Sequence, residues 1–359
     1  MPALLLGCPA APSPEQAGNP GEDSYLLRKL MQESPQMKVH ILDDWFDTLR
    51  HLPSFARLDG HDVTIWNDHT EDLDLLADRL QDAEALVLFR ERTPVTAALL
   101  DRLPNLRLIS QRGVYPHVDV PACTAHGVTF SSNTSATGPS IAAAEMTFAL
   151  ILASARQIPQ QMASLKAGHW QMGVGQTLAG RTLGLYGYGK IGGQVAKYAS
   201  AFGMHVVWWG SDEGRARAAA DGETVATDRH AFFAQSDFVS VHVRLTPKSR
   251  GIITADDLLA MRPSATFVNT SRSGLVAPGA LDQALVAGRP GRLALDVFDV
   301  EPLTDTQDPL ITHPNVIATP HIGYVTEDEL DMQFADIYDQ INAYAAGAPI
   351  HVVNPDVQR

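Results

Sequence analysis

Three charged side chains in the second half of the sequence are placed where they could act together on a small organic acid. Arg272, Glu301 and His321 each follow a short apolar run that predicts a β-strand. The three segments are NTSRSGL (269–275), LDVFDVEP (295–302) and ATPHIG (318–323). Ligands of open α/β sheets bind outside the carboxyl ends of the strands, so these side chains are expected to share one cleft. A guanidinium fork matches a carboxylate, and an imidazole transfers protons near neutral pH.

A glycine-rich loop, GYGKIG at 187–192, directly follows the predicted strand at 183–186 and begins a predicted helix. In this context the first glycine permits a tight turn, the second lets the backbone approach a pyrophosphate, and the third allows close helix packing. The phosphates then lie at a helix N-terminus, where free N–H groups favour negative charge. The loop predicts a dinucleotide site, and its predicted cofactor-binding residues are Gly187, Gly189, Lys190, Ile191 and Gly192.

The ribose end of this site leaves two cofactors open. Enzymes that use NAD usually carry an acidic residue at the end of the next strand, where this chain has Gly210. Asp212 could reach back to the ribose, which favours NAD. Ser211 with Arg215 or Arg217 could instead accept a 2′-phosphate, which favours NADP, although both arginines also suit a solvated helix face. The interpretation adopted is NAD binding by Gly210, Ser211 and Asp212, with NADP as the alternative.

The elements that must position these residues alternate regularly. Short apolar runs and amphipathic stretches follow one another in two series, which predicts an α/β protein with two doubly wound parallel sheets. Strands are expected at 38–42, 62–66, 85–89 and 106–110, and then at 183–186, 206–209, 238–243, 266–269, 293–297 and 316–319. Helices are expected at 45–55, 73–80, 96–100 and 140–155. The last is apolar nearly all round, which predicts burial between domains or at a subunit contact.

The predicted domain organisation has three parts. Residues 1–36 are expected to be a disordered extension, because Pro9, Pro12, Pro14, Pro20 and Gly21 disfavour regular structure there. A flavodoxin-like substrate domain is expected at 37–138 and 324–359, and a Rossmann NAD-binding domain at 139–323.

Composition excludes several other classes of function. The 359 residues carry a net charge of −14, which disfavours a nucleic-acid partner. Cys8 and Cys123 lie too far apart for a metal-ligand motif and indicate a reducing compartment, so no metal is expected. No apolar run is long enough to span a bilayer. A cytoplasmic protein that binds a small molecule is expected.

In their sequences and in their order along the chain, the segments above resemble the D-isomer-specific 2-hydroxyacid dehydrogenases, a family that includes 3-phosphoglycerate, glycerate and D-lactate dehydrogenases. The resemblance extends from about residue 37 and includes AEALVLFR (83–90), LAGRTLG (178–184), VHVRLTP (241–247) and HPNV (313–316). It implies that Arg272 binds the carboxylate and carbonyl of the substrate, that His321 is the acid/base, and that Glu301 pairs with His321. It also implies interconversion of a D-2-hydroxy acid and a 2-keto acid by hydride transfer, and a homodimer formed through the cofactor domains.

Further site residues come from the same resemblance. Asp296 would hold the nicotinamide carboxamide, and the loop at 242–246 with the backbone near Thr270 would line the cofactor. The implied cofactor contacts are therefore His242, Val243, Arg244, Thr246, Thr270, Ser271, Asp296 and Gly323. The implied substrate contacts are Arg90, Gly113, Val114 and Tyr115, together with Arg272.

The chain departs from the family in its substrate loop, which reads QRGVYPHVD at 111–119 where relatives have a glycine-rich sequence. Arg112 adds a charge there, and residues 115–117 change the shape of the loop, so the substrate is left open. Arg244 replaces a usual proline and Ser273 a usual glycine, and nothing in the sequence explains either change.

Two rival functions are considered. A formate dehydrogenase of the same superfamily would pair its histidine with glutamine, and Glu301 argues against it. A dinucleotide-sensing protein related to the C-terminal-binding corepressors would need the glycine-rich loop but no turnover.

Overall fold

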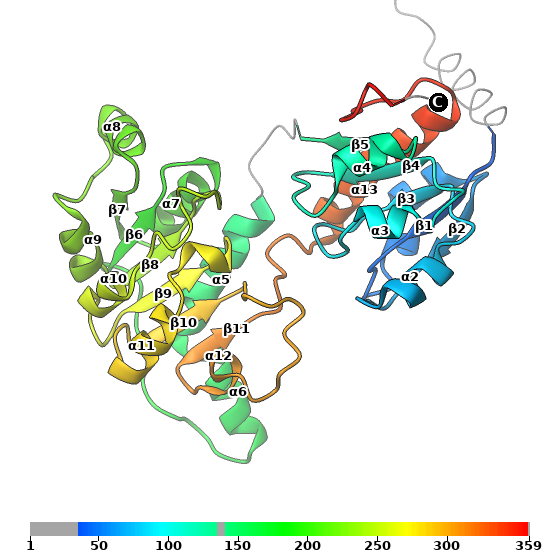
Figure 1. The fold of residues 1–359 in the computed structure, drawn as a ribbon. Helices are drawn as coiled ribbons and strands as arrows, with labels where there is room; N and C mark the ends of the chain where they lie inside the picture. Colours follow the sequence, from blue (N-terminus) through cyan, green and yellow to red (C-terminus); the bar gives the residue numbers. More distant parts are fainter. Residues whose placement is uncertain (1–34, 135–140, 358–359) are drawn as a thin grey trace, which may run out of the picture. The chain divides into compact units, whose positions relative to one another are not determined.

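Two parallel β-sheets organise the chain, and each lies in its own compact unit (Figure 1). The computed structural model describes residues 35–134 and 141–357. Unit 1 takes in residues up to Ala136 together with Leu330–Arg359, and unit 2 is Thr137–Glu329. The α/β class predicted from the alternating pattern is confirmed. The extension at 1–34 lies outside the described residues.

Unit 1 contains a five-stranded sheet of order β2-β1-β3-β4-β5 with every pair parallel. Its elements are β1 (Lys38–Ile41), η2 (Leu49–His51), η3 (Pro53–Leu58), β2 (Asp62–Ile65), α2 (Leu73–Arg79), β3 (Ala85–Val87), α3 (Ala97–Leu100), β4 (Leu108–Arg112), α4 (Val120–Ala125), β5 (Thr129–Asn133) and α13 (Glu327–Ala345). Apolar residues of α2, α3 and α4 form one core with β3, β4 and β5. Helix α13, which is far from the other elements in the sequence, also packs in this unit: the Phe334 ring lies edge-on against the Phe89 ring, with the ring centres 5.1 Å apart.

Unit 2 contains a six-stranded sheet of order β11-β10-β9-β8-β6-β7, again with every pair parallel. Its elements are α5 (Ile141–Arg156), α6 (Ile158–Lys166), β6 (Thr182–Tyr186), α7 (Lys190–Ala201), β7 (His205–Trp209), α8 (Asp212–Ala220), α9 (Arg229–Gln235), β8 (Phe238–Val241), α10 (Ala255–Ala260), β9 (Thr266–Asn269), η4 (Ser273–Leu275), α11 (Ala280–Ala287), β10 (Arg292–Leu295), α12 (Pro309–Thr312) and β11 (Val316–Ala318). Because β7 and β8 lie on opposite sides of β6, the strand order reverses beside β6, where such sheets bind ligands.

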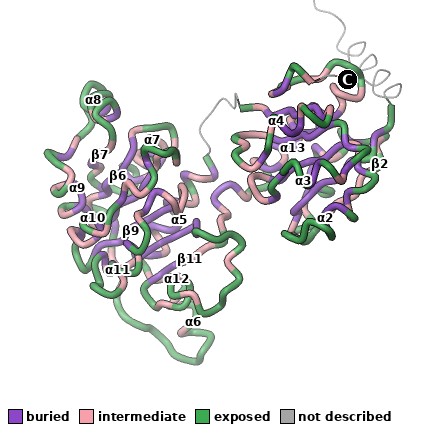
Figure 2. Tube along the Cα trace, viewed as in Figure 1, coloured by how far each residue is buried: buried purple, intermediate pink, exposed green. Residues whose placement is uncertain are grey.

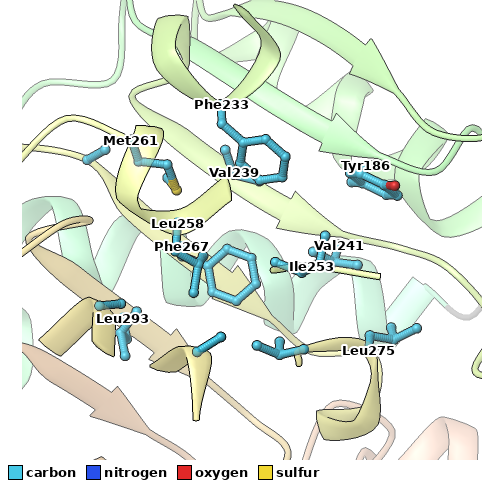
Figure 3. Packing of buried hydrophobic residues seen from close by; sticks show 14 of the residues in the cluster. Tyr186, Phe233, Val239, Val241, Ile253, Leu258, Met261, Phe267, Leu275 and Leu293 are labelled. Atoms are coloured by element: carbon cyan, nitrogen blue, oxygen red, sulfur yellow. The ribbon is translucent and has the colours of Figure 1, made fainter. Parts of the chain in front are cut away.

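Both faces of the unit 2 sheet are covered: the central strands β8 and β9 are buried throughout their length, while the outer surfaces of the helices are exposed (Figure 2). Side chains alternate along a strand, so Val239 and Val241 of β8 point to one face and Phe238 to the other. The first face packs under α9, α10 and α11, with Phe233, Phe267 and their neighbours forming a continuous apolar layer (Figure 3). The second packs under α5 and α7. This double burial holds the strand ends in fixed positions.

Two details of the expected elements need correction. Instead of the predicted helix at 45–55 the chain forms two short 3-10 helices, η2 and η3, which are separated by Leu52. Strand β5 was not predicted, because its sequence TFSSN is mostly polar although the strand is buried. Helix α5 packs against α7, β9 and β10 within its own unit, while its expected burial between domains or at a subunit contact stays a prediction.

Among the described residues, no single helix has the length and apolar composition needed to cross a membrane. The bent pair α5 and α6 reaches that length only when the two helices are taken together.

Candidate active site

The predicted loop residues of unit 2 gather at one edge of its sheet. The strands are all parallel, so the segments that follow their carboxyl ends emerge on the same side. Gly187 follows β6, Gly210 follows β7 and His242 follows β8. Arg272, Glu301 and His321 follow β9, β10 and β11 in the same way. The edge therefore brings the glycine-rich loop and the predicted triad into one row.

The glycine-rich loop has the backbone that a pyrophosphate requires. Gly187 has φ +113°, and a Cβ there would lie 2.5 Å from the carbonyl oxygen of His242. A Cβ on Gly192 would lie 2.9 Å from the Gly187 oxygen, so this glycine lets α7 pack closely on the turn. Gly189 precedes α7, and nothing lies within 4 Å of a Cβ built on it. The loop is closed on the protein side and open at Gly189, which fits a phosphate at the start of α7. Lys190 is exposed and Ile191 packs into the core.

The loop after β8 is held by its own hydroxyl groups. Ser249 donates from Oγ to the Arg244 carbonyl at 2.6 Å, and the Thr246 N–H donates to Ser249 Oγ at 2.8 Å. His242 Nε2 lies 3.0 Å from Ser240 Oγ, and burial lowers the pKa of His242 to about 4. This imidazole is therefore neutral at neutral pH. Val243 packs against the core under α9 to α11.

The loop after β9 is tied to its neighbours on both sides. Thr270 Oγ1 lies 2.6 Å from Thr147 Oγ1 of α5, and Ser271 donates from Oγ to the Val241 carbonyl at 2.7 Å. Arg272 comes next, and its Nη1 donates to the Ser271 carbonyl at 2.7 Å. The guanidinium is half-buried at the strand end. This bond ties the guanidinium to the backbone of its own loop, and its planar fork suits a carboxylate.

Glu301 and His321 form a pair, as the sequence predicts. His321 Nδ1 lies 2.6 Å from Glu301 Oε2, and the other carboxylate oxygen accepts the Phe298 N–H at 2.8 Å. Burial alone would raise the pKa of Glu301, but the bond and charge of His321 and the Phe298 N–H together hold it below its usual value. Among the described residues, no hydrogen bond is made by His321 Nε2, so the nitrogen opposite the carboxylate is left for a ligand. The Tyr324 ring packs edge-on against the imidazole.

Asp296 has a role that sequence reasoning missed. Its carboxylate is fully buried and accepts from Thr319 Oγ1 at 2.6 Å, from the Ile322 N–H at 2.9 Å and from the Gly323 N–H at 2.8 Å. Burial raises the pKa of Asp296 against the effect of these bonds. Pro320 and His321 lie between the bonded residues Thr319 and Ile322, and His321 has φ +52°, a backbone conformation that residues other than glycine adopt at a cost. Asp296 thus fixes the turn that carries His321, while its contact with a nicotinamide stays a prediction.

In unit 1, the predicted substrate residues lie after the carboxyl ends of β3 and β4. Arg90 has φ +65° and Gly113 has φ +101°. The Gly113 carbonyl accepts a hydrogen bond from Ser132 Oγ at 2.8 Å. The Tyr115 ring packs edge-on against the Phe130 ring, with the ring centres 5.1 Å apart. Val114 is exposed. Their contact with a substrate stays a prediction.

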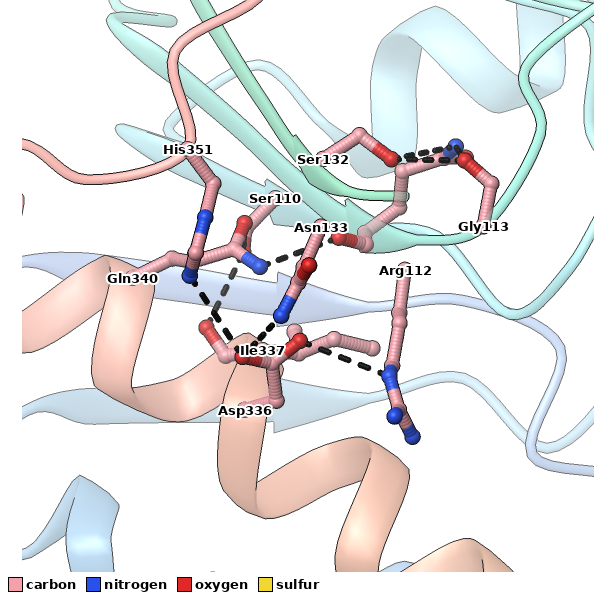
Figure 4. Close-up of polar contacts among 10 residues, drawn as sticks. Ser110, Arg112, Gly113, Ser132, Asn133, Asp336, Ile337, Gln340 and His351 are labelled. Carbon is pink, nitrogen blue, oxygen red and sulfur yellow. Dashed lines mark hydrogen bonds and ion pairs between the residues drawn. The ribbon is translucent and has the colours of Figure 1, made fainter. Parts of the chain in front are cut away.

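Arg112 begins this loop, and its charge has a partner within unit 1 (Figure 4). Arg112 Nε lies 3.5 Å from Asp336 Oδ2 of α13, while Asp336 Oδ1 accepts Asn133 Nδ2 at 3.0 Å. Asp336 therefore connects α13 to the ends of β4 and β5. Further along the loop, burial lowers the pKa of His117, so its imidazole is neutral at neutral pH.

Comparisons with known proteins identify the family and the fold of the chain. Residues 148–323 match the family model of the D-isomer specific 2-hydroxyacid dehydrogenase, NAD binding domain. The hydroxypyruvate reductase of Thermotoga maritima is 35% identical over 275 residues, which are 76% of this chain and 87% of the relative. The D-3-phosphoglycerate dehydrogenase of Methanocaldococcus jannaschii is 38% identical over 275 residues, which are 76% of this chain but 52% of the relative. This chain thus spans about half the length of that relative.

A solved structure gives the same result for the fold. A candidate D-3-phosphoglycerate dehydrogenase of Ralstonia solanacearum is 44% identical, with a TM-score of 0.85 over 90% of this chain and 98% of the other. The loop at 187–192, the row of strand ends and these matches together place the chain in the family of D-isomer-specific 2-hydroxyacid dehydrogenases.

Proposed function

We propose that the protein interconverts a D-2-hydroxy acid and the corresponding 2-keto acid with a nicotinamide cofactor. The observation that carries the proposal is the Glu301–His321 pair, which leaves Nε2 for a substrate on the sheet edge that also holds the glycine-rich loop. Membership of the family and the names of the relatives, a hydroxypyruvate reductase and a phosphoglycerate dehydrogenase, support it.

The proposed residue roles follow from the chemistry of carbonyl reduction. When the cofactor is bound, hydride transfer to the carbonyl carbon is the chemistry that it supplies. His321 gives a proton from Nε2 to the carbonyl oxygen, and Glu301 favours the charged imidazolium that can give it. Arg272 holds the substrate carboxylate and polarises the carbonyl. In the oxidative direction each transfer is reversed. Arg90, Gly113, Val114 and Tyr115 complete the proposed substrate contacts.

The test is a reduction assay with a panel of 2-keto acids in which loss of NADH or NADPH absorbance is followed. His321→Ala is expected to lower kcat by about 10²–10⁴-fold, the usual effect of removing a general acid. His205→Ala is the matched control, because His205 is exposed at the opposite, amino end of β7. Wild-type turnover in the His321 variant would remove this residue from the mechanism. If no keto acid is reduced with either cofactor although the cofactor binds, the dinucleotide-sensing alternative is favoured.

The assembly and compartment are part of the same proposal. We propose a cytoplasmic homodimer formed through the NAD-binding units, as in the family that the chain resembles. The compartment is proposed because Cys8 and Cys123 lie far apart in the sequence, which indicates a reducing environment and not a disulfide framework. Light scattering on a size-exclusion column tests the dimer, and a single peak at the mass of one chain would contradict it.

A further inference from the structure

Arg112 is both the last residue of β4 and the second residue of the substrate loop at 111–119. Side chains alternate along a strand, so Arg112 points to the same face of the sheet as Ser110. Ser110 Oγ donates to the Ile337 carbonyl of α13 at 2.9 Å, which places α13 on that face. The Arg112 side chain therefore lies where the end of β4, the helix α13 and the substrate loop meet.

One side of the Arg112 guanidinium has an acidic partner. Nε lies 3.5 Å from Asp336 Oδ2, and both atoms are buried but make no hydrogen bond with any described residue. Asp336 Oδ1 is bonded to Asn133 Nδ2 at 3.0 Å, which holds the carboxylate in place. Buried polar atoms of native proteins are nearly always hydrogen-bonded, and exceptions often lie at functional positions. The ion pair therefore orients the guanidinium without satisfying its donors.

The other side of the guanidinium is open. The two Nη atoms point away from Asp336 (Figure 4). Within residues 35–134 and 141–357 neither Nη atom has a hydrogen-bond partner, and only Nε is closed to solvent. The side chain as a whole is 13% exposed, so most of the cation has left water without gaining an acceptor. This desolvation costs free energy unless other oxygens replace the water. Ligand oxygens at the two Nη atoms would supply the missing bonds.

The backbone next to Arg112 leaves room for a ligand. Gly113 has φ +101°, and nothing lies within 4 Å of a Cβ built on it. The side chain of Val114 is 53% exposed. Both residues are predicted substrate contacts, so a substrate that reaches them lies within two residues of the open side of the guanidinium.

The charge at this position suits a carboxylate better than a phosphate. The two Nη donors form a planar fork that matches the two oxygens of a carboxylate. Asp336 weakens the positive field of Arg112, because its negative charge lies 3.5 Å from Nε. Removing a doubly charged phosphate from water costs more than removing a singly charged carboxylate, and a weakened field offsets less of that cost.

We propose that Arg112 binds a second carboxylate of the substrate, so that the protein prefers dicarboxylic 2-keto and 2-hydroxy acids. The inference rests on the proposed function and deepens it, because it names the class of substrate for the same reaction. Arg272 keeps its proposed role with the carboxylate beside the reacting carbon, and Arg112 holds the carboxylate at the far end. Arg112 determines specificity and takes no part in the transfer of hydride or proton.

The test compares keto acids of equal length that differ in the second carboxylate. The pairs are 2-oxoglutarate with 2-oxopentanoate, and oxaloacetate with 2-oxobutanoate, and kcat/KM is measured with the full chain. In at least one pair the dicarboxylic acid is expected to have a kcat/KM at least about tenfold higher. Arg112→Gln should lower that value by roughly 10- to 100-fold, the effect of a lost bond to a charged group, and should hardly change the value for the monocarboxylic acid.

Two further variants separate the subsite from a damaged fold. Arg107→Gln is the matched control, because Arg107 is an exposed arginine at the opposite, amino end of β4 that pairs with Glu84. It should leave the preference for the dicarboxylic acid unchanged. Arg112→Lys keeps the charge but not the planar fork, so it should restore part of the preference that Arg112→Gln loses. Circular dichroism confirms that each variant remains folded.

A binding measurement makes the test independent of turnover. Calorimetric titration of 2-oxoglutarate into the full chain with NAD⁺ present, where no reduction can occur, is expected to show binding that Arg112→Gln weakens by a similar factor. Binding that is equally strong in this variant contradicts the role of Arg112.

The outcomes separate the two proposals. Equal kcat/KM values within both pairs, or a preference that Arg112→Gln leaves unchanged, overturn the subsite and leave the proposed function standing. A clear preference for 3-phosphohydroxypyruvate over both dicarboxylic acids also overturns the assignment to a carboxylate. If no keto acid is reduced with NADH or NADPH, the proposed function fails, and the calorimetric comparison still decides whether Arg112 binds the second carboxylate.

Discussion

The histidine of the site depends on side chains that never need to touch a substrate. Glu301 fixes one nitrogen of His321 at 2.6 Å, and Asp296 bonds the backbone on the far side of the same turn. A left-handed φ at His321 persists because these bonds compensate for it. The consequence is that the imidazole is placed before any ligand arrives, and little entropy is lost on binding.

Replacing Glu301 by glutamine should change the pH response of the site. The amide keeps the shape but loses the charge that favours the imidazolium, so keto-acid reduction is expected to decline at lower pH than in the wild type. The measurement is kcat/KM against pH for both proteins. An unshifted profile would show that the carboxylate has no influence on the proton donor.

At acidic pH the folding stability of the protein should depend on whether the Glu301 carboxylate is charged. Folding holds the pKa of Glu301 below its ordinary value of 4.5, so the stabilisation by its charged form is complete above pH 4.5 and is lost as the pH falls through the lowered pKa. The difference in melting temperature between wild type and Glu301→Gln is therefore expected to shrink in acid. A constant difference down to strongly acidic pH contradicts the shift.

Arg272→Lys tests whether geometry or charge holds the substrate. Lysine keeps the positive charge but offers a point donor instead of a planar fork. The expected loss in kcat/KM is roughly 10- to 100-fold, which corresponds to about 1.5–3 kcal/mol for a bond to a charged group. An unchanged kcat/KM shows that the fork is not used.

At the scale of elements, the glycine-rich loop connects β6 to α7 through two glycines with different tasks. Gly187→Ala forces a Cβ to within 2.5 Å of the His242 carbonyl at φ +113°, so it is expected to distort the turn and lower the melting temperature. Gly189→Ala meets nothing within 4 Å and should leave the protein without cofactor as stable as the wild type. Both variants are expected to lose NADH binding, because at Gly189 the added methyl lies where the pyrophosphate approaches. Normal NADH binding by the Gly189 variant would contradict the placement of the phosphate.

The sequence predicts these elements well where the signal is local. The glycine-rich loop is recognised because strand, turn and helix follow one another within a few residues. Strand β5 was missed because Ser131 and Ser132 are buried, and this burial depends on partners distant in sequence, such as the His351 carbonyl that accepts the Ser132 N–H. The role of Asp296 was missed for the same reason, since its partners are 23 to 27 residues away.

At the scale of the whole molecule, the chain has separate apolar cores, one in unit 1 and the others in unit 2. Calorimetry of the full chain is expected to show two unfolding transitions, because each unit buries its own core. Bound cofactor at about 100 times its dissociation constant should stabilise the unit 2 transition by about 2.7 kcal/mol and leave the other unchanged. Phe130→Leu, a change in the unit 1 core, should lower the melting temperature of the unit 1 transition alone. This variant therefore shows which transition belongs to which unit. A single transition that responds to both changes contradicts this independence.

Unit 1 is built from the two ends of the described chain, and this matters for how the protein is made. The Phe130 N–H of β5 donates to Asn354 Oδ1 at 2.8 Å, and Ser110 Oγ of β4 donates to Gln340 Oε1 of α13 at 2.9 Å. On a translating ribosome these partners emerge only after unit 2 has been synthesised in full. The first half of unit 1 therefore cannot complete its folding while unit 2 folds, because α13 is not yet available to pack against its sheet. A ribosome stalled after residue 329 should present a unit 2 that resists protease beside a unit 1 that is still cleaved.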